Sequence, residues 1–259
     1  MTTRQATEFP EIKRSCVPTV DTEQMIEVDR LMMEDYRIDL VRMMENAGRA
    51  LAHLARARFL DGDPANRAVV VMAGGGGNGG GALVAARRLA GWGANVVVGL
   101  GQDPNAMAPV PAYQLSILQR MGVQGADRVA DIPLLSRAGH AADIILDGLI
   151  GYSLRGDPSG TIGELIVTAN AVSAPVLSLD APSGVDTATG AVHSPAIDAT
   201  ATMTLALPKA GLFSQRASDR VGELYLADIS VPPVLYAEPS LDMQVAPLFA
   251  RSDIVRVVE

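Results

Sequence analysis

An internal disulfide is excluded by the cysteine content, because the 259-residue chain holds one cysteine, Cys16. A lone thiol cannot close an internal disulfide, which fits a protein of a reducing compartment. No base or metal ligand stands near Cys16, so we interpret this thiol as unreactive. No apolar run approaches the ~20 residues of a membrane span, and residues 1–16 lack the apolar segment of a secretory signal. We therefore expect a cytoplasmic protein with no membrane partner.

Positive charge, histidine and aromatic residues are also scarce. The formal net charge is −8, and nucleic acid is not an expected partner, because phosphate contacts need clustered Lys and Arg. The three histidines, His53, His140 and His193, stand apart from one another and from Cys16, so each is interpreted as structural and a zinc site is not expected. With aromatics at only 4%, the core must consist of Ala, Val, Leu and Met.

The chain has no internal repeat and no Pro/Ser/Gly linker, and its length fits one large α/β domain. We predict a single domain over residues 1–259. It divides into a polar arm (1–20), a helical extension (21–60), an α/β core (68–230) and a tail (231–259). For the segment at 252–259, both a strand and a partner-binding end stay open.

Two helices are predicted before the core, over residues 20–37 and 38–60. Asp21 can cap the first helix while Gln24 reaches back to it, which is a capping-box pattern. Asp39 is the predicted N-cap of the second helix, whose apolar residues recur at helical spacing and form one stripe. These two helices are expected to pack on the α/β core.

The core alternates short apolar runs with helical segments, which is typical of a parallel sheet covered by helices on both faces. Strands are predicted over residues 68–73, 94–100, 142–150, 174–182, 199–208 and 222–229. Helices are predicted over residues 82–93, 110–122 and 161–172. In such folds ligands bind at the carboxyl ends of the strands, so the loops that follow the strands are the place to look for a site.

The first of these loops is almost all glycine. Seven of the eight residues from Gly74 to Gly81 are glycine, and the exception is Asn78. Free backbone N–H groups at a helix start attract anions, and glycine lets the backbone close on a ligand. A tight turn alone would need one or two glycines, so we interpret the run as a ligand-binding loop. No acidic residue ends the next strand and no Lys-Ser/Thr follows the glycines, which argues against a plain dehydrogenase and a P-loop NTPase.

Polar side chains follow two further strands. Asp147 precedes a glycine-rich loop that contains Arg155, and Asp180 precedes Ser183. Both loops have a simpler structural interpretation. Arg155 could be a solvated surface charge, and Asp180 could cap a turn. The rival interpretation is a shared site at one sheet edge, whose carboxylate, hydroxyl and amide oxygens would suit a hard cation.

Three of these segments resemble the YjeF N-terminal domain family, whose known enzymes are NAD(P)H-hydrate epimerases. The segments are MAGGGGNGGGALVAARRLAGWGANVVV, ILDGLIGYSLRGDPSG and LSLDAPSGVDTATGAV. Both leading helices and the segment ALPKAGL, with Lys209, extend the resemblance over about residues 22–229. The resemblance implies a Rossmann-like three-layer α/β/α sandwich. It also implies interconversion of the R and S forms of hydrated NADH and NADPH, a separate NAD(P)H-hydrate dehydratase as pathway partner, and a homodimer.

The resemblance also implies site residues. A monovalent cation, K⁺, would lie near Asn78, Asp147 and Ser183. The hydrated cofactor would lie on the glycine run, the next loop and one carboxylate: Gly76, Gly77, Asn78, Gly79, Gly80, Gly81, Gly151, Tyr152, Ser153, Leu154, Arg155, Gly156, Asp157 and Asp180. The family motif usually reads G-N-N-G-G-D-G, so Gly77 and Gly81 replace an Asn and an Asp.

Epimerisation at the hydrated carbon requires either a broken and remade bond to oxygen or an opened ring. Either route moves a proton, which a positioned acid or base assists. We predict Asp180 as the catalytic residue, with Asp147 second, and Arg155 as a partner of a phosphate. Two alternatives stay open: a non-catalytic nucleotide- or ligand-binding or scaffold protein on the same fold, and a nucleotide-dependent oxidoreductase or transferase.

Overall fold

The computed structural model describes residues 9–123, 125 and 142–259, which build one eight-stranded sheet in the order β1-β8-β7-β6-β5-β4-β2-β3. The strands are β1 (Glu11–Lys13), β2 (Ala68–Ala73), β3 (Asn95–Leu100), β4 (Ile144–Gly148), β5 (Val176–Leu179), β6 (Ala201–Leu205), β7 (Glu223–Ala227) and β8 (Ile254–Val258). Every neighbouring pair is parallel except β7 and β8. The predicted α/β fold with a mostly parallel sheet is confirmed.

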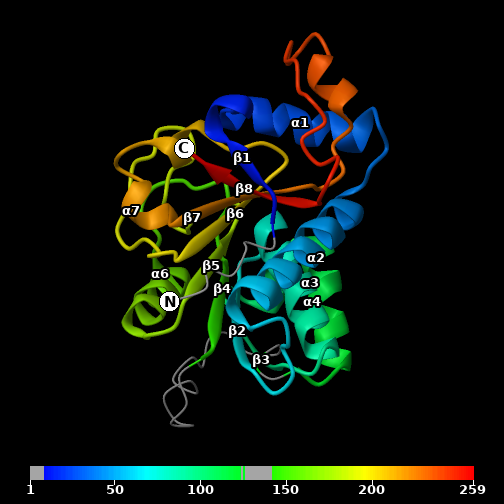
Figure 1. The fold of residues 1–259 in the computed structure, drawn as a ribbon. Coiled ribbons are helices and arrows are strands. Elements are labelled where there is room, and N and C mark those ends of the chain that lie inside the picture. The colour runs from blue at the N-terminus through cyan, green and yellow to red at the C-terminus, as the bar shows by residue number, and fades with distance from the viewer. Residues whose placement is uncertain (1–8, 124, 126–141) are drawn as a thin grey trace.

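Helices cover both faces of the sheet (Figure 1). The α-helices are α1 (Thr22–Glu34), α2 (Leu40–Phe59), α3 (Gly77–Gly91), α4 (Pro109–Arg120), α6 (Gly160–Ala171) and α7 (Ser218–Val221). Short 3-10 helices are η1 (Arg14–Cys16), η2 (Pro104–Ala106), η3 (Ala210–Phe213) and η4 (Pro233–Ala237). In Figure 1, α2, α3 and α4 lie on one face, α6 and α7 on the other, and α1 crosses the end of the molecule beside β1 and β8.

Both leading helices begin where local sequence predicts. Asp21 accepts the N–H of Gln24 at 2.8 Å while Gln24 Oε1 accepts the N–H of Asp21 at 3.0 Å, a complete capping box. Asp39 accepts the N–H of Arg42 at 2.9 Å and caps α2. Such caps stabilise a helix by about 1 kcal/mol each, and they fix the start of the two helices that cover the site.

The two ends of the chain contribute strands in addition to the six predicted for the core. The run at 222–229 is not the last strand, because β8 follows it and pairs antiparallel with β7. Of the two alternatives for residues 252–259, the strand is confirmed. The segment expected as an irregular arm contains β1, which pairs with β8. A three-residue strand has too little sequence pattern to be recognised without its partner.

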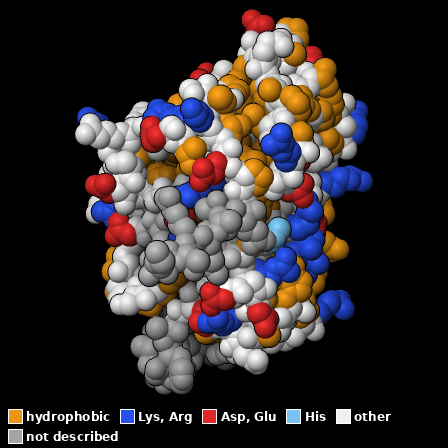
Figure 2. All heavy atoms as spheres, in the orientation of Figure 1, with side chains coloured by type: hydrophobic (Ala, Val, Ile, Leu, Met, Phe, Trp, Pro, Cys, Tyr) orange, Lys and Arg blue, Asp and Glu red, His pale blue; other side chains and the backbone are white. Residues whose placement is uncertain are grey.

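The buried core consists mostly of Ala, Val, Leu, Ile and Met side chains, with Phe9, Tyr225 and Tyr236 as its buried aromatic residues in the described chain. Figure 2 shows apolar side chains gathered on the surface over α1 and η4, where Ile26, Met33 and Val234 are exposed. Among the described helices, none is both long and apolar enough to cross a membrane.

Candidate active site

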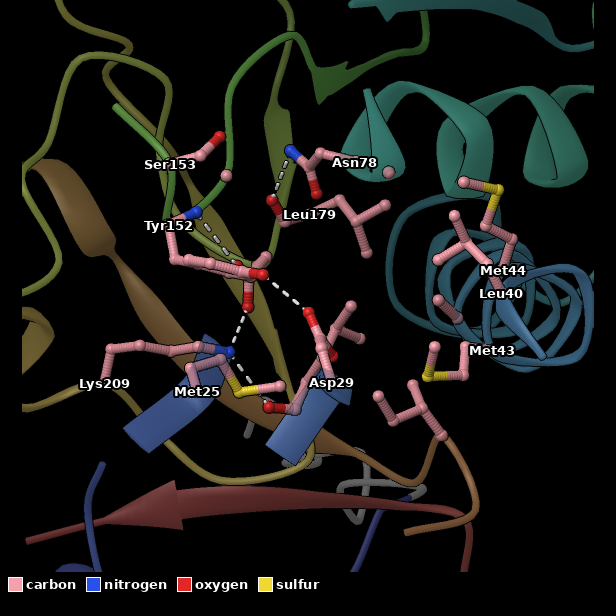
Figure 3. A pocket seen from close by; sticks show the side chains of 16 residues that line it. Met25, Asp29, Leu40, Met43, Met44, Asn78, Tyr152, Ser153, Leu179 and Lys209 are labelled. Atoms are coloured by element: carbon pink, nitrogen blue, oxygen red, sulfur yellow. Dashed lines mark hydrogen bonds and ion pairs between the residues drawn. The ribbon is translucent and has the colours of Figure 1, made fainter. Parts of the chain in front are cut away.

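A pocket lies at the carboxyl ends of the central strands, between them and the two leading helices (Figure 3). Its lining residues are Met25, Asp29, Leu40, Met43, Met44, Ala47, Gly77, Asn78, Gly151, Tyr152, Ser153, Leu179, Asp180, Leu205, Lys209 and Ile229. One wall is apolar and comes mainly from α1 and α2. The other is polar and comes from the segments that follow β4, β5 and β6, so the pocket has one side for an apolar ring and one for polar chemistry.

Asp180 follows β5 directly and forms the polar floor of the pocket together with Lys209. The two side chains form an ion pair, and only 6% of Asp180 and 1% of Lys209 is exposed. Asp180 Oδ2 also accepts the N–H of Tyr152 at 3.3 Å, while Lys209 Nζ donates to the carbonyl oxygen of Leu205 at 3.0 Å. Burial of a charge is costly without a partner, so each of these two charges depends on the other.

The backbone of Asp180 is strained, with a φ of +65°. Few non-glycine residues adopt this left-handed conformation, and residues held in it cluster at active sites and ligand clamps. The hydrogen bond from the N–H of Asp180 to the carbonyl oxygen of Met203, at 2.7 Å, holds this conformation in place. Six other non-glycine residues of the described chain share this conformation, and Asp180 is the one among them that lines the pocket.

Asp29 and Tyr152 form a second polar contact in the same pocket. The Tyr152 hydroxyl donates to Asp29 Oδ2 at 2.5 Å. Burial raises the pKa of the Asp29 carboxyl, although the bond from Tyr152 and the charge of Lys209 oppose it. Burial and the nearby carboxylates likewise raise the pKa of Tyr152. The N–H and hydroxyl of Tyr152 therefore connect Asp180 with Asp29 (Figure 3).

Asn78 brings an unpaired polar atom to the pocket. Its Nδ2 donates to the carbonyl oxygen of Leu179 at 3.0 Å, and this bond fixes the orientation of the amide. Its Oδ1 is buried and has no hydrogen-bond partner. Buried polar atoms are normally paired, so this oxygen is available for a bound cation or a donor group of a ligand.

Asp147 lies behind the pocket and does not line it. Its carboxylate is fully buried, and each oxygen accepts two hydrogen bonds. Oδ1 accepts from Ser183 Oγ at 2.6 Å and the N–H of Leu149 at 3.2 Å, and Oδ2 accepts from Ser178 Oγ at 2.8 Å and the N–H of Ser183 at 2.9 Å. Burial raises the pKa of Asp147, and these bonds oppose that rise. The structure does not bring this predicted catalytic carboxylate to the pocket.

The glycine run is not one continuous ligand-binding loop, because α3 begins at Gly77 and not at the predicted Ala82. A Cβ atom at Gly79 would lie 1.8 Å from the carbonyl oxygen of Gly74, and one at Gly80 would lie 2.3 Å from Met44 Sδ. These glycines permit close packing inside the loop and against α2. Packing overrides the low helix propensity of glycine here. The predicted start of this helix at residue 82 is therefore wrong by five residues.

The predicted substrate-binding residues divide into two groups. Those that line the pocket are Gly77, Asn78, Gly151, Tyr152, Ser153 and Asp180. Those that do not line it are Gly76, Gly79, Gly80, Gly81, Leu154, Arg155, Gly156 and Asp157. Of the latter, Arg155 is exposed, and Asp157 lies 3.0 Å from His193 Nδ1 and accepts the N–H of Ser194 at 3.1 Å.

His193 is thus paired with Asp157, and His53 packs edge-on against Phe9 with ring centroids 5.6 Å apart. These contacts agree with structural roles for both histidines. His140 lies outside the described residues.

Two charged lining residues, Asp29 and Lys209, are not among the predicted site residues. Lys209 lies in the segment ALPKAGL, which extends the family resemblance. The available signal was a lone lysine in an apolar stretch just after a predicted strand. Asp29 lies in α1, and no sequence pattern distinguishes its carboxylate from the other acidic residues of that helix.

The chain is similar to known proteins over most of its length. The family model for the YjeF-related protein N-terminus matches residues 41–211, which run from α2 through the Lys209 segment. The NAD(P)H-hydrate epimerase of Dehalogenimonas lykanthroporepellens is 39% identical over 245 residues, which is 95% of either chain. The bifunctional NAD(P)H-hydrate repair enzyme Nnr of Moorella thermoacetica is 35% identical over 84% of this chain and 41% of its own length.

Among solved structures, the crystal structure of the yeast protein ynu0 (YNL200c) has the same fold. The TM-score is 0.74 at 21% sequence identity, over 93% of this chain and 100% of the yeast chain. This chain belongs to the family of the YjeF-related protein N-terminus. The resemblance predicted from its motifs and the Rossmann-like α/β sandwich are both confirmed.

Proposed function

We propose that this protein is an NAD(P)H-hydrate epimerase that interconverts the R and S forms of hydrated NADH and NADPH and so serves cofactor repair. Relatives of that name cover nearly the whole chain. The observation that carries the proposal is the buried Asp180–Lys209 ion pair on the pocket floor, with the strained backbone of Asp180. A buried carboxylate held in one position is suited to move a proton.

The lining residues divide the work of the reaction. The apolar wall, with Leu40, Met43 and Met44, would hold the nicotinamide-derived ring and keep water from it. Asp180 would accept and return the proton that moves at the hydrated carbon. Lys209 would stabilise the Asp180 carboxylate and fix its direction. The start of α3 at Gly77 would offer N–H groups to an anionic part of the ligand.

The proposed K⁺ finds its support at Asn78, whose buried Oδ1 is unpaired. Ser183 Oγ donates to Asp147 and accepts the N–H of Ile150 at 2.9 Å, and the Asp147 oxygens are paired as well. In the described part of the chain, no cluster of three or more His, Cys, Asp and Glu residues is placed to hold a metal ion. The donor set thus fits K⁺ in part: Asn78 would be the direct ligand, with Asp147 contributing charge from behind. A bound K⁺ would offset negative charge on the ligand or carboxylates.

An NAD(P)H-hydrate dehydratase that uses the product is part of this proposal, because the relative from Moorella thermoacetica is named a bifunctional NAD(P)H-hydrate repair enzyme. That this dehydratase is a separate protein stays a prediction. The homodimer and the cytoplasmic location stay predictions. The scaffold alternative keeps one observation in its favour, the absence of polar side chains at Gly77 and Gly81.

We expect the purified protein to speed the recovery of NADH from R-NADHX when K⁺ and an S-specific dehydratase are present. The rate above the spontaneous background should be proportional to protein concentration. Asp180→Asn should lower it by a factor of about 10² to 10⁴, the usual contribution of a positioned acid–base group. Asp157→Asn is the matched control, because this carboxylate lies outside the pocket. No rate above background for the unmodified protein would favour the scaffold alternative.

Replacement of Asn78 by alanine tests the cation. Turnover of the unmodified protein should rise with K⁺ and saturate, and Asn78→Ala should shift the K⁺ concentration at half-maximal rate upward by at least roughly tenfold, which corresponds to one ligand bond of about 1.4 kcal/mol. Tetramethylammonium chloride keeps the ionic strength constant throughout. A rate that is independent of K⁺ would contradict the proposed cation.

A further inference from the structure

The pocket contains a second carboxylate besides that of Asp180, namely Asp29 (Figure 3). It comes from α1, whereas Asp180 follows β5. It also precedes residue 41, where the match to the family model begins. Tyr152 joins the two carboxylates, since its N–H donates to Asp180 and its hydroxyl donates to Asp29.

We propose that Asp29 is the second acid–base residue of this pocket and works on the opposite face of the substrate ring from Asp180. The inference rests on the proposed epimerase function and deepens it. An epimerisation that breaks and remakes one bond exposes first one face of the reacting carbon and then the other. Proton donors and acceptors are therefore needed on both sides, and Asp29 and Asp180 reach the one pocket from two different elements, α1 and the end of β5.

The two carboxylates differ in their surroundings. Asp180 is paired directly with Lys209, whereas the direct partner of Asp29 is the neutral Tyr152 hydroxyl. Burial raises the pKa of Asp29. The ionisable groups that act on Asp29 are Tyr152, Lys209, Asp180 and, from η4, Tyr236. When two titratable groups have such different environments, one commonly acts as the acid and the other as the base. In this pocket Asp29 is the acid and Asp180 is the base.

The proton and electron transfers balance without a further reactant. Asp29, as the carboxylic acid, gives its proton to the hydroxyl on the hydrated carbon, and the carbon–oxygen bond breaks with release of water. The lone pair of the adjacent ring nitrogen then forms a carbon–nitrogen double bond to the carbon that lost the hydroxyl group. Water then attacks the other face, the double-bond electrons return to nitrogen, and the Asp180 carboxylate takes the proton from the attacking water. Exchange of protons with solvent, or the reverse reaction, restores both carboxyl groups.

Asp29→Asn tests the inference, because it keeps the shape and removes the proton donor. Chromatographic separation of the R and S forms gives the rate directly at each pH, after subtraction of the spontaneous rate. We expect kcat to fall about 100-fold or more while KM changes by less than threefold. The unmodified protein should lose rate as the pH rises through the raised pKa of Asp29, since the acid form disappears. The variant should not show this decline.

Glu27→Gln is the matched control, because it removes another carboxylate from α1 whose partners, Arg30 and Ser240, lie outside the pocket. It should leave kcat and the pH profile unchanged. Asp29→Glu should recover part of the rate. Thermal melting of each variant shows whether it is folded.

The outcomes separate the two proposals. If the unmodified protein does not speed epimerisation, the proposed function fails. If the unmodified protein is active and folded Asp29→Asn keeps its kcat and its alkaline decline, the role of Asp29 alone is overturned. If kcat falls but the alkaline decline persists, Asp29 acts by positioning Tyr152, and the acid–base assignment is overturned.

Discussion

Lys209→Met is expected to destabilise the protein by about 3–5 kcal/mol, because it leaves the Asp180 carboxylate buried without its partner. Only 1% of the Lys209 side chain and 6% of that of Asp180 is exposed, so water cannot replace the lost ion pair. For a chain of this size the melting temperature should fall by about 2–4 °C per kcal/mol. Urea unfolding gives the free energy directly.

A double-mutant cycle separates the loss of the pair from the loss of packing. Asp180→Asn in the Lys209→Met background removes the unpaired charge, so the double variant should be more stable than Lys209→Met alone. Lys13 is the only other lysine and is exposed on β1, so Lys13→Met should change stability by less than about 0.5 kcal/mol. Equal effects of Lys209→Met and Lys13→Met would contradict the structural role of the pair.

The sequence predicts those features that depend on short stretches of chain. The caps at Asp21 and Asp39 are local, because donor and acceptor lie three residues apart. The position of Asp180 at a strand's carboxyl end is equally local, since an apolar run ends at this residue. Its neighbours in the pocket are not local, because Asp29 and Lys209 reach it from two other elements. No spacing rule connects residues that only the tertiary fold brings together.

Asp147 and Asp180 show how similar sequence contexts lead to different environments. Each carboxylate stands at or near the end of an apolar strand. Ser178, on the neighbouring β5, and Ser183, in the loop beyond it, supply hydroxyl donors to Asp147. Asp180 instead meets an ammonium group from the segment after β6. The order of the strands in the sheet determines which donors surround each carboxylate. The sequence around a carboxylate does not predict that order.

The glycine run can also be explained in two ways from sequence alone. Glycine is needed either so that the backbone can close on a ligand, or because a neighbouring chain segment leaves no room for a side chain. Gly79→Ala separates these two reasons. Its Cβ would lie 1.8 Å from the carbonyl oxygen of Gly74, which is backbone and cannot rotate away. We expect a loss of about 3 kcal/mol or more, at or beyond the upper end of the usual cost of overpacking. Urea unfolding measures this loss.

Gly77→Ala is the matched control from the same run. The one contact that its Cβ would make is with Met44 Cε, at 4.0 Å. In the first turn of α3 it should leave stability unchanged or raise it by about 0.5–1 kcal/mol, because alanine loses less backbone entropy than glycine. If both variants lost stability equally, packing would not explain the run.

The same contrast bears on the two positions where this chain departs from the family motif. A Cβ at Gly81 would lie 2.9 Å from Leu179 Cδ2, so any larger residue requires that leucine side chain to move. Gly77 has room for a side chain at the edge of the pocket. Packing therefore accounts for the glycine at 81 but not for the glycine at 77. Gly77→Asn should fold as stably as the unmodified protein, and any change in its epimerisation rate would report on the ligand alone.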